Sequence, residues 1–103
     1  MILAIFVRRL RPGVSFSEFK EAWVAEPNHF GRPVRVSHAQ RMDDDREIVS
    51  YALFEATRGE VEEALRIPAV AQREHARHSR IDQVIECTVL KGLYEVVDTT
   101  ELT

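Results

Sequence analysis

The sequence predicts one α+β domain with the element order βαββαβ. Its 103 residues are the usual size of a single domain. Two segments are expected to be helical, and each lies between segments that are expected to be strands. A cap and an apolar stripe indicate the first, near residues 15–26, and acidic residues at the start with basic residues at the end indicate the second, residues 58–80. Two similar βαβ halves in one short chain are typical of a four-stranded antiparallel sheet with its helices on one face.

The first strand is expected at Ile2–Leu10. Its even-numbered and odd-numbered residues point to opposite faces of a sheet, and both sets are mostly apolar. The sequence Arg11-Pro12-Gly13 then breaks the strand. A strand that is apolar on both sides is expected to be covered on both sides.

The first helix is predicted to begin just after Ser15. Ser15 and Glu18 have the spacing of a capping box, in which each side chain accepts a hydrogen bond from the other residue's backbone N–H. Pro27 should end the helix, because proline lacks the N–H and restricts the residue before it. One apolar stripe with helical spacing follows the cap: Phe16, Phe19, Ala22 and Trp23.

The second and third strands are expected at residues 34–42 and 47–56, joined by a hairpin turn at residues 43–45. The second strand is apolar on one side only, which suits a strand near the edge of a sheet. The third is apolar on both sides, like the first. The apolar side of the second strand holds Val34, Val36, His38 and Met42.

The second helical region, residues 58–80, is expected to be divided into two helices at Pro68. A final extended segment is predicted at residues 84–97, longer than an ordinary strand. Gly92 is expected to mark a bulge or bend within it.

Together these elements predict the ferredoxin-like fold, in which the first and third strands are central. Two helical regions can cover only one face of such a sheet. The other apolar face needs a cover, and a second copy of the chain packed sheet to sheet would supply it. We therefore expect a homodimer in which two sheets form an α+β barrel, with residues 84–97 extending onto the partner.

The chain resembles the dimeric α+β barrel superfamily, which includes the antibiotic-biosynthesis-type monooxygenases and the EthD-like proteins. The resemblance covers most of the chain and rests on the order and spacing of a few features. These are Arg11-Pro12-Gly13 after the first strand, Phe19 and Trp23 on the first helix, His29 after it, and the stretches Pro68–Val70 and Glu74-His75.

The resemblance implies roles for particular residues. In the monooxygenase branch a histidine at the position of His75 often faces a pocket between helices and sheet, so His75 is a candidate catalytic residue. The EthD-like branch has a histidine near the position of His29. Heme-degrading members use an asparagine and a tryptophan where this chain has Phe6 and Leu65, so the resemblance does not extend to heme degradation.

His38 is the second candidate catalytic residue, because it is a polar residue in an apolar row and imidazole titrates near neutral pH. The alternative is a structural histidine at the edge of the sheet. Trp23, Tyr51 and Phe6 are candidates for an aromatic pocket wall, and core packing is the alternative for Trp23. His29 is a candidate ligand-binding residue because loops often carry function, although most loop histidines are simply exposed.

We expect no metal site and no tightly bound cofactor. His75 and His78 are neighbours on a helix and could join His38 around a metal, but no carboxylate or cysteine stands at a diagnostic spacing. His78 is otherwise expected to be a solvated residue near the helix end. The sequence also has no phosphate-binding glycine loop and no G-x-S-x-G motif.

Charge and composition limit the partners. The formal net charge is −3, which gives no reason to expect binding to nucleic acid or to an anionic membrane. A single cysteine, Cys87, excludes an intrachain disulfide and fits a reducing compartment, so we expect a cytoplasmic protein.

Two classes of function remain open. One is a cofactor-independent monooxygenase, isomerase or cyclase that acts on a small aromatic or polyketide-like compound. The other is a non-catalytic ligand-binding or stress-associated dimer that uses the same pocket. The fold alone does not separate them, because function resides in the site.

Overall fold

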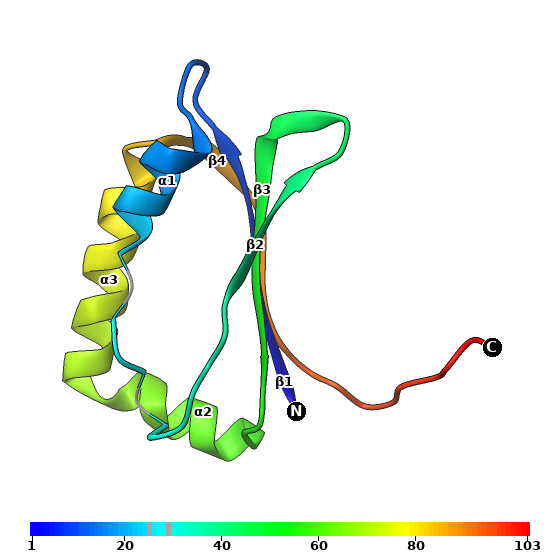
Figure 1. Ribbon diagram of the computed structural model, residues 1–103. Coiled ribbons are helices and arrows are strands. Elements are labelled where there is room, and N and C mark those ends of the chain that lie inside the picture. The colour runs from blue at the N-terminus through cyan, green and yellow to red at the C-terminus, as the bar shows by residue number, and fades with distance from the viewer. Residues whose placement is uncertain (25, 29) are drawn as a thin grey trace.

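The computed structural model describes residues 1–24, 26–28 and 30–103, and within them a layer of three helices lies on one face of a four-stranded sheet (Figure 1). The C-terminal segment leaves on the other side of the sheet. The predicted α+β fold is thereby confirmed. The elements are β1 (Ile2–Leu10), α1 (Phe16–Trp23), β2 (Ser37–Arg41), β3 (Asp44–Phe54), α2 (Arg58–Arg66), α3 (Pro68–Asp82) and β4 (Ile85–Glu95).

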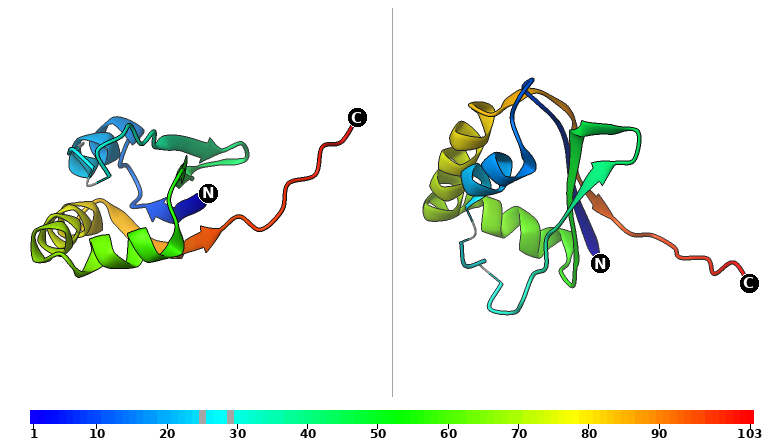
Figure 2. Two further views of the ribbon diagram at one scale, coloured as in Figure 1. Left: turned by 90° about the horizontal axis from the view of Figure 1, so that it is seen from below. Right: turned by 45° about the horizontal axis from the view of Figure 1, so that its top comes forward.

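The strands have the order β2-β3-β1-β4, and every neighbouring pair is antiparallel. β1 and β3 are therefore central, as their two apolar faces predict. This is the strand order of the ferredoxin-like fold. Both views in Figure 2 show the helices on the same side of the sheet, so none of the described helices covers the opposite face.

The helix boundaries follow local signals. Ser15 Oγ accepts a hydrogen bond from Glu18 N at 3.2 Å, and Glu18 Oε1 accepts one from Ser15 N at 3.3 Å, which confirms the predicted capping box. Thr57 and Glu60 form the same arrangement at the start of α2. Pro68 begins α3, so the predicted division of the second helical region is also confirmed.

The hairpin between β2 and β3 differs from the expected one. β2 is shorter than residues 34–42, and the turn consists of Met42 and Asp43. Asp44 already belongs to β3, because it pairs with Arg41 of β2. Its carboxylate accepts hydrogen bonds from Arg46 N at 3.1 Å and from Arg9 Nη1 at 2.7 Å. Met42 is fully exposed in the turn and does not share the apolar side of the strand.

The irregularity in β4 does not lie at Gly92. Gly92 pairs regularly with Ile5, and the register shifts instead between Val7 and Arg8, which face Leu90 and Thr88. Gly92 has a different role. A Cβ added there would lie 2.7 Å from Cε2 of Tyr94, so the absence of a side chain lets that ring lie against the strand.

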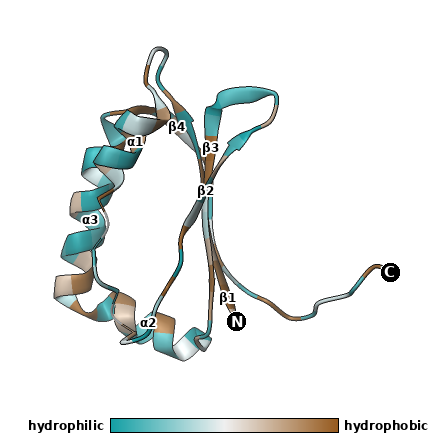
Figure 3. Cartoon of the chain, viewed as in Figure 1, coloured by the Kyte–Doolittle hydropathy of each residue, from teal (hydrophilic) through white to brown (hydrophobic). Residues whose placement is uncertain are grey.

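The core is divided into two clusters, one at each end of β1. Leu10, Phe19 and Ile48 belong to one cluster and are nearly inaccessible to solvent, and Ile2 and Val61 belong to the other. The N-terminal part of β1 is brown in Figure 3, whereas the hairpin end of β2 and β3 is teal. Between the two clusters the helix-facing side of β1 borders a cavity.

The face of the sheet away from the helices carries three neighbouring rows of mostly apolar residues, which we call the open face. Several of these side chains are about half exposed, including Leu53 at 54 %. A contiguous apolar surface of this kind is unusual on a monomer. Across β3, β1 and β4 the rows are Leu53–Leu3–Tyr94, Tyr51–Ile5–Gly92 and Val49–Val7–Leu90.

No helix in the described part of the chain has the length and apolarity that crossing a lipid bilayer requires.

Candidate functional site

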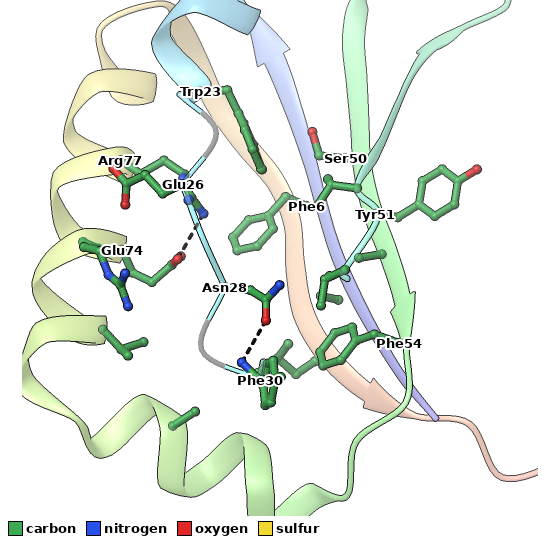
Figure 4. Close-up of a pocket in the computed structure, with 18 of the residues that line it drawn as sticks. Phe6, Trp23, Glu26, Asn28, Phe30, Ser50, Tyr51, Phe54, Glu74 and Arg77 are labelled. Atoms are coloured by element: carbon green, nitrogen blue, oxygen red, sulfur yellow. Dashed lines mark hydrogen bonds and ion pairs between the residues drawn. The ribbon is translucent and has the colours of Figure 1, made fainter. Parts of the chain in front are cut away.

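A cavity of about 500 Å³ lies between the sheet and the helix layer. Ala4 and Phe6 of β1 and Ser50, Ala52 and Phe54 of β3 form its sheet side. These residues share a face because side chains of a strand alternate. The volume lies in the range of small-molecule sites, which are mostly apolar with a few polar groups. Figure 4 shows the ring of Phe6 projecting into this space, opposite α3.

The helix side of the cavity comes mainly from α3. Val70, Arg73, Glu74 and Arg77 line it, and their spacing of three or four residues places them on one face of the helix. One turn further on, Ile81 belongs to the buried core, so the same face of α3 is apolar at its C-terminal end and charged beside the cavity.

The connection from α1 to β2 closes another side of the cavity. Asn28 orders it, since Oδ1 accepts a hydrogen bond from Phe30 N at 2.8 Å and Nδ2 donates to Arg32 O at 2.8 Å. These bonds hold Phe30 against Phe54, with 5.4 Å between the ring centroids (Figure 4). This end of the cavity is therefore aromatic and aliphatic.

His38 and Ser50 face each other across β2 and β3 at the sheet side of the cavity. His38 Nδ1 lies 2.7 Å from Ser50 Oγ, which is hydrogen-bond distance. Ser50 is buried, with 3 % of its surface exposed. The hydroxyl therefore fixes the orientation of the imidazole ring.

Three aromatic rings surround His38. Its ring centroid lies 5.1 Å from that of Trp23, 5.8 Å from that of Phe19 and 6.0 Å from that of Phe16. Burial lowers the pKa of His38, and the positive charges of Lys20 and Arg8 lower that pKa further. The imidazole is thus neutral at pH 7, and a neutral imidazole has one unprotonated ring nitrogen.

Trp23 lines the cavity and also packs against the core cluster of Leu10 and Phe19, so it lies at the boundary between the cavity and the core. The guanidinium of Arg77 lies 4.5 Å from the centre of its ring, and the ammonium of Lys20 lies 5.6 Å from it. Contacts of this kind are favourable cation–π interactions. These contacts place the positive charges of Lys20 and Arg77 at the end of the cavity beside Trp23.

Glu74 connects the charged groups of α3. It accepts a hydrogen bond from Arg77 Nη1 at 3.0 Å, and its Oε2 lies 3.6 Å from His78 Nε2. The close approach of His78 and the charge of Arg77 hold the pKa of Glu74 below its usual range, although burial opposes this shift. His78 is half-buried and packs its ring edge against Phe6 with 5.3 Å between centroids, so it is not the solvated residue that was expected.

His75 does not lie where the resemblance places it. It is exposed on α3 and is absent from the described residues that line the cavity, whereas Glu74 and Arg77 on either side of it are present. The physical reason is helical periodicity, because His75 is one position away from the stripe that faces the sheet. His38 is therefore the histidine that the described cavity contains.

Tyr51 borders the cavity, but its ring points to the opposite side of the sheet (Figure 4). The alternation of β3 explains this, because Ser50 and Ala52 on either side of it face the helices. Phe6 does line the cavity, as expected. His29, the remaining candidate ligand-binding residue, lies outside the described residues.

Within the residues that the structure describes, no three histidine, cysteine, aspartate or glutamate side chains lie close enough together to hold a metal ion. His38 belongs to β2, whereas His75 and His78 belong to α3, and the three do not form a cluster.

Ser50, Glu74 and Arg77 were not among the predicted site residues, although the helical face that carries Glu74 and Arg77 was detectable. Counting back from Ile81 in steps of three and four residues reaches His78, Arg77, Glu74 and Val70. That stripe predicts charged residues on the buried side of α3. No local signal in the sequence indicates Ser50, because its role depends on its contact with His38 of the neighbouring strand.

Comparison with known proteins supports the fold. No family model matches the sequence, and no curated protein matches it. A solved structure of a candidate antibiotic biosynthesis monooxygenase from Chloroflexus aurantiacus J-10-fl has a similar fold, with a TM-score of 0.58. The two sequences are 13 % identical, and the match covers 99 % of this chain and 98 % of the other. At this identity the similarity shows that the two chains share a fold, and it shows nothing beyond the fold.

Proposed function

We propose that the chain binds a small apolar or aromatic molecule in the cavity and removes a proton from it, as a cofactor-independent monooxygenase, isomerase or cyclase. The observation that carries this proposal is the His38–Ser50 pair at 2.7 Å, beside an otherwise largely apolar cavity. The similar solved structure is of a candidate monooxygenase, which is compatible with this class of chemistry.

Proton removal is the first step shared by these three reactions. Loss of a proton from a phenol, or from a carbon next to a carbonyl, produces the electron-rich anion that then isomerises, cyclises or reacts with dioxygen. A general base for this step needs a neutral imidazole within reach of the substrate. The lowered pKa of His38 keeps it neutral at pH 7.

Ser50 is the positioning residue in this proposal. If His38 Nδ1–H donates to Ser50 Oγ, the lone pair of Nε2 is free to accept the substrate's proton. Phe6 and Trp23 hold the substrate's ring by their flat surfaces. The largely apolar surroundings of the sheet side limit competition from water.

The test is deuterium exchange at the α-carbon of an enolisable ketone, because it reports proton removal without requiring the physiological substrate. In D₂O, 2-tetralone is incubated with the protein and the loss of its α-proton signal is followed by NMR. His38→Gln is expected to lower the protein-dependent rate by roughly 10²–10⁴-fold. Ser50→Ala is expected to have a smaller effect, because it leaves the base in place.

His75→Gln is the matched control, since His75 is exposed and outside the described cavity lining. Its exchange rate should equal that of the wild type. An equal rate in wild type and His38→Gln would refute the role of His38. Binding of 2-tetralone without any exchange would instead favour the non-catalytic ligand-binding function.

We further propose that two copies associate through the open face. Three rows of mostly apolar residues, centred on Ile5, continue across β3, β1 and β4, and no described helix or strand covers them. A two-fold dimer buries the same surface on both copies, so an apolar patch is complementary to itself. Obligate homodimers commonly bury about 2,000 Å² or more in total.

Sedimentation equilibrium at micromolar concentration tests the dimer, which should have twice the chain mass of 11.9 kDa. A folded monomer at that concentration would refute it. The measurement is made with a reductant, because Cys87 is exposed and free and could form an intermolecular disulfide. One free thiol fits the reducing cytoplasm, where we place the protein.

A further inference from the structure

Arg8 is a buried guanidinium beside the cavity. It has 3 % of its surface exposed, and its guanidinium lies 4.4 Å from the ring centre of Phe6, which lines the cavity. Among the described residues no carboxylate lies within ion-pair distance of it, and its Nη1 atom has no hydrogen-bond partner. A buried charge without a partner is costly and normally has a compensating group.

The pKa of Arg8 is consistent with a buried charge that has no ion-pair partner among the described residues. Burial lowers its pKa to about 10, and the neighbouring charge of Arg77 adds to the lowering. The negative charges of Asp82 and Glu74 oppose the shift without reversing it. The site of Arg8 is therefore one where an additional negative charge would be stabilised.

Arg77 supplies a second unsatisfied donor at the same end of the cavity. Its Nη1 donates to Glu74, but its Nε is buried and has no partner. The guanidinium also contacts Trp23, at 4.5 Å from the ring centre. Contacts with Trp23 and Glu74 hold it in place beside the cavity (Figure 4).

The cavity has an excess of positive charge. Its described lining includes three cationic side chains, Lys20, Arg73 and Arg77, and two carboxylates, Glu26 and Glu74, a difference of one. Glu74 already interacts with Arg77 and His78. Glu26 Oε1 lies 3.6 Å from Arg80 Nη2, whereas Glu26 Oε2 is buried without a hydrogen-bond partner among the described residues.

The other end of the cavity is apolar. Phe30 and Phe54 meet there, next to Val61, Ala64 and Leu65 of α2. The cavity therefore has one end that favours an anion and one that favours hydrocarbon. A neutral molecule would leave the buried donors at the first end unsatisfied.

We infer that the ligand is an organic acid with an aromatic or alicyclic body and one carboxylate, the carboxylate bound by Arg77 with Arg8 close behind it. A guanidinium matches a carboxylate through parallel N–H···O hydrogen bonds, so arginine at this end selects that group. The hydrocarbon body lies toward Phe30 and Phe54. This inference rests on the proposed function and specifies its substrate class.

Isothermal titration calorimetry with 2-naphthoate and 2-naphthamide tests the inference, because the two probes share one ring system and differ in charge. The wild type is expected to bind the acid at least tenfold more tightly than the amide. Arg77→Met, which keeps an unbranched apolar stem and removes the guanidinium, should abolish that preference, and Arg77→Lys should restore part of it. Arg66→Met removes the same charge from an exposed position of α2 outside the described lining, and should leave both affinities unchanged.

Salt dependence gives a second measurement that needs no variant. Raising NaCl from about 50 mM to 500 mM should weaken binding of 2-naphthoate and leave that of 2-naphthamide nearly constant. Equal affinities for acid and amide in the wild type would overturn the inference. If 2-tetralone still exchanges its α-protons in that case, the proposed function survives and only the substrate class is wrong.

Discussion

The two faces of β1 have similar hydropathy but different roles. On the side that faces the helices, Ile2 and Leu10 are buried in the core, and Phe6 borders the cavity. On the other side, Ile5 and Val7 remain partly exposed on the open face. The difference lies in what covers each face, since hydrophobic side chains drive burial without specifying the partner.

The covered face contributes most to the stability of the chain itself. Phe19 has no exposed surface and joins α1 to the sheet, so Phe19→Ala is expected to lower the free energy of unfolding by about 3–5 kcal/mol. Leu53→Ala, on the open face, should cost less than about 1 kcal/mol in the isolated chain. Urea denaturation of both variants at protein concentrations below the dimer dissociation constant measures the contrast, and equal losses would contradict it.

A charge at the centre of the open face should act on association. Ile5→Lys is expected to raise the dimer dissociation constant by at least about 100-fold, or about 2.7 kcal/mol, because a buried unpaired ammonium would oppose the contact. Sedimentation velocity over a range of concentrations measures it. Met42→Lys is the control, since Met42 is fully exposed in the hairpin turn, and it should leave the dissociation constant unchanged.

The cap of α1 makes a smaller contribution to the covered face. Ser15→Ala removes the acceptor for Glu18 N and is expected to cost about 1 kcal/mol. A thermal melt measures the loss, and Ser15→Asp, which keeps an acceptor, should recover most of it. A melting temperature unchanged by Ser15→Ala would show that this capping box adds no stability.

The smallest effect is expected from the titration of His38. Its pKa is lowered in the folded chain, so the unfolded chain takes up a proton first as the pH falls. Stability should therefore fall on acidification below about pH 6.5, the ordinary pKa of histidine. His38→Gln lacks this titration, so its stability should vary less between pH 7 and pH 5. Parallel curves for the two proteins would contradict the assignment.

Comparing His38 with His75 shows which kind of sequence signal could predict a residue of the site. His38 interrupts an apolar row, and this local pattern was enough to place it beside the cavity. His75 was chosen by resemblance of position, and the helix turns it outward. Tyr51 was chosen for its chemistry, although strand alternation directs its ring to the open face.

The sequence by itself determined the local features of this protein. Capping boxes, the break at Pro68 and the bounds of β1 depend on residues within a few positions of one another, so they could be predicted. The tertiary structure alone decided which side of β1 the helices cover, because both sides are apolar. It also brought Ser50 to His38 and left Arg8 buried without an ion pair among the described residues. These features depend on pairing between distant segments, and no local pattern of hydropathy encodes that pairing.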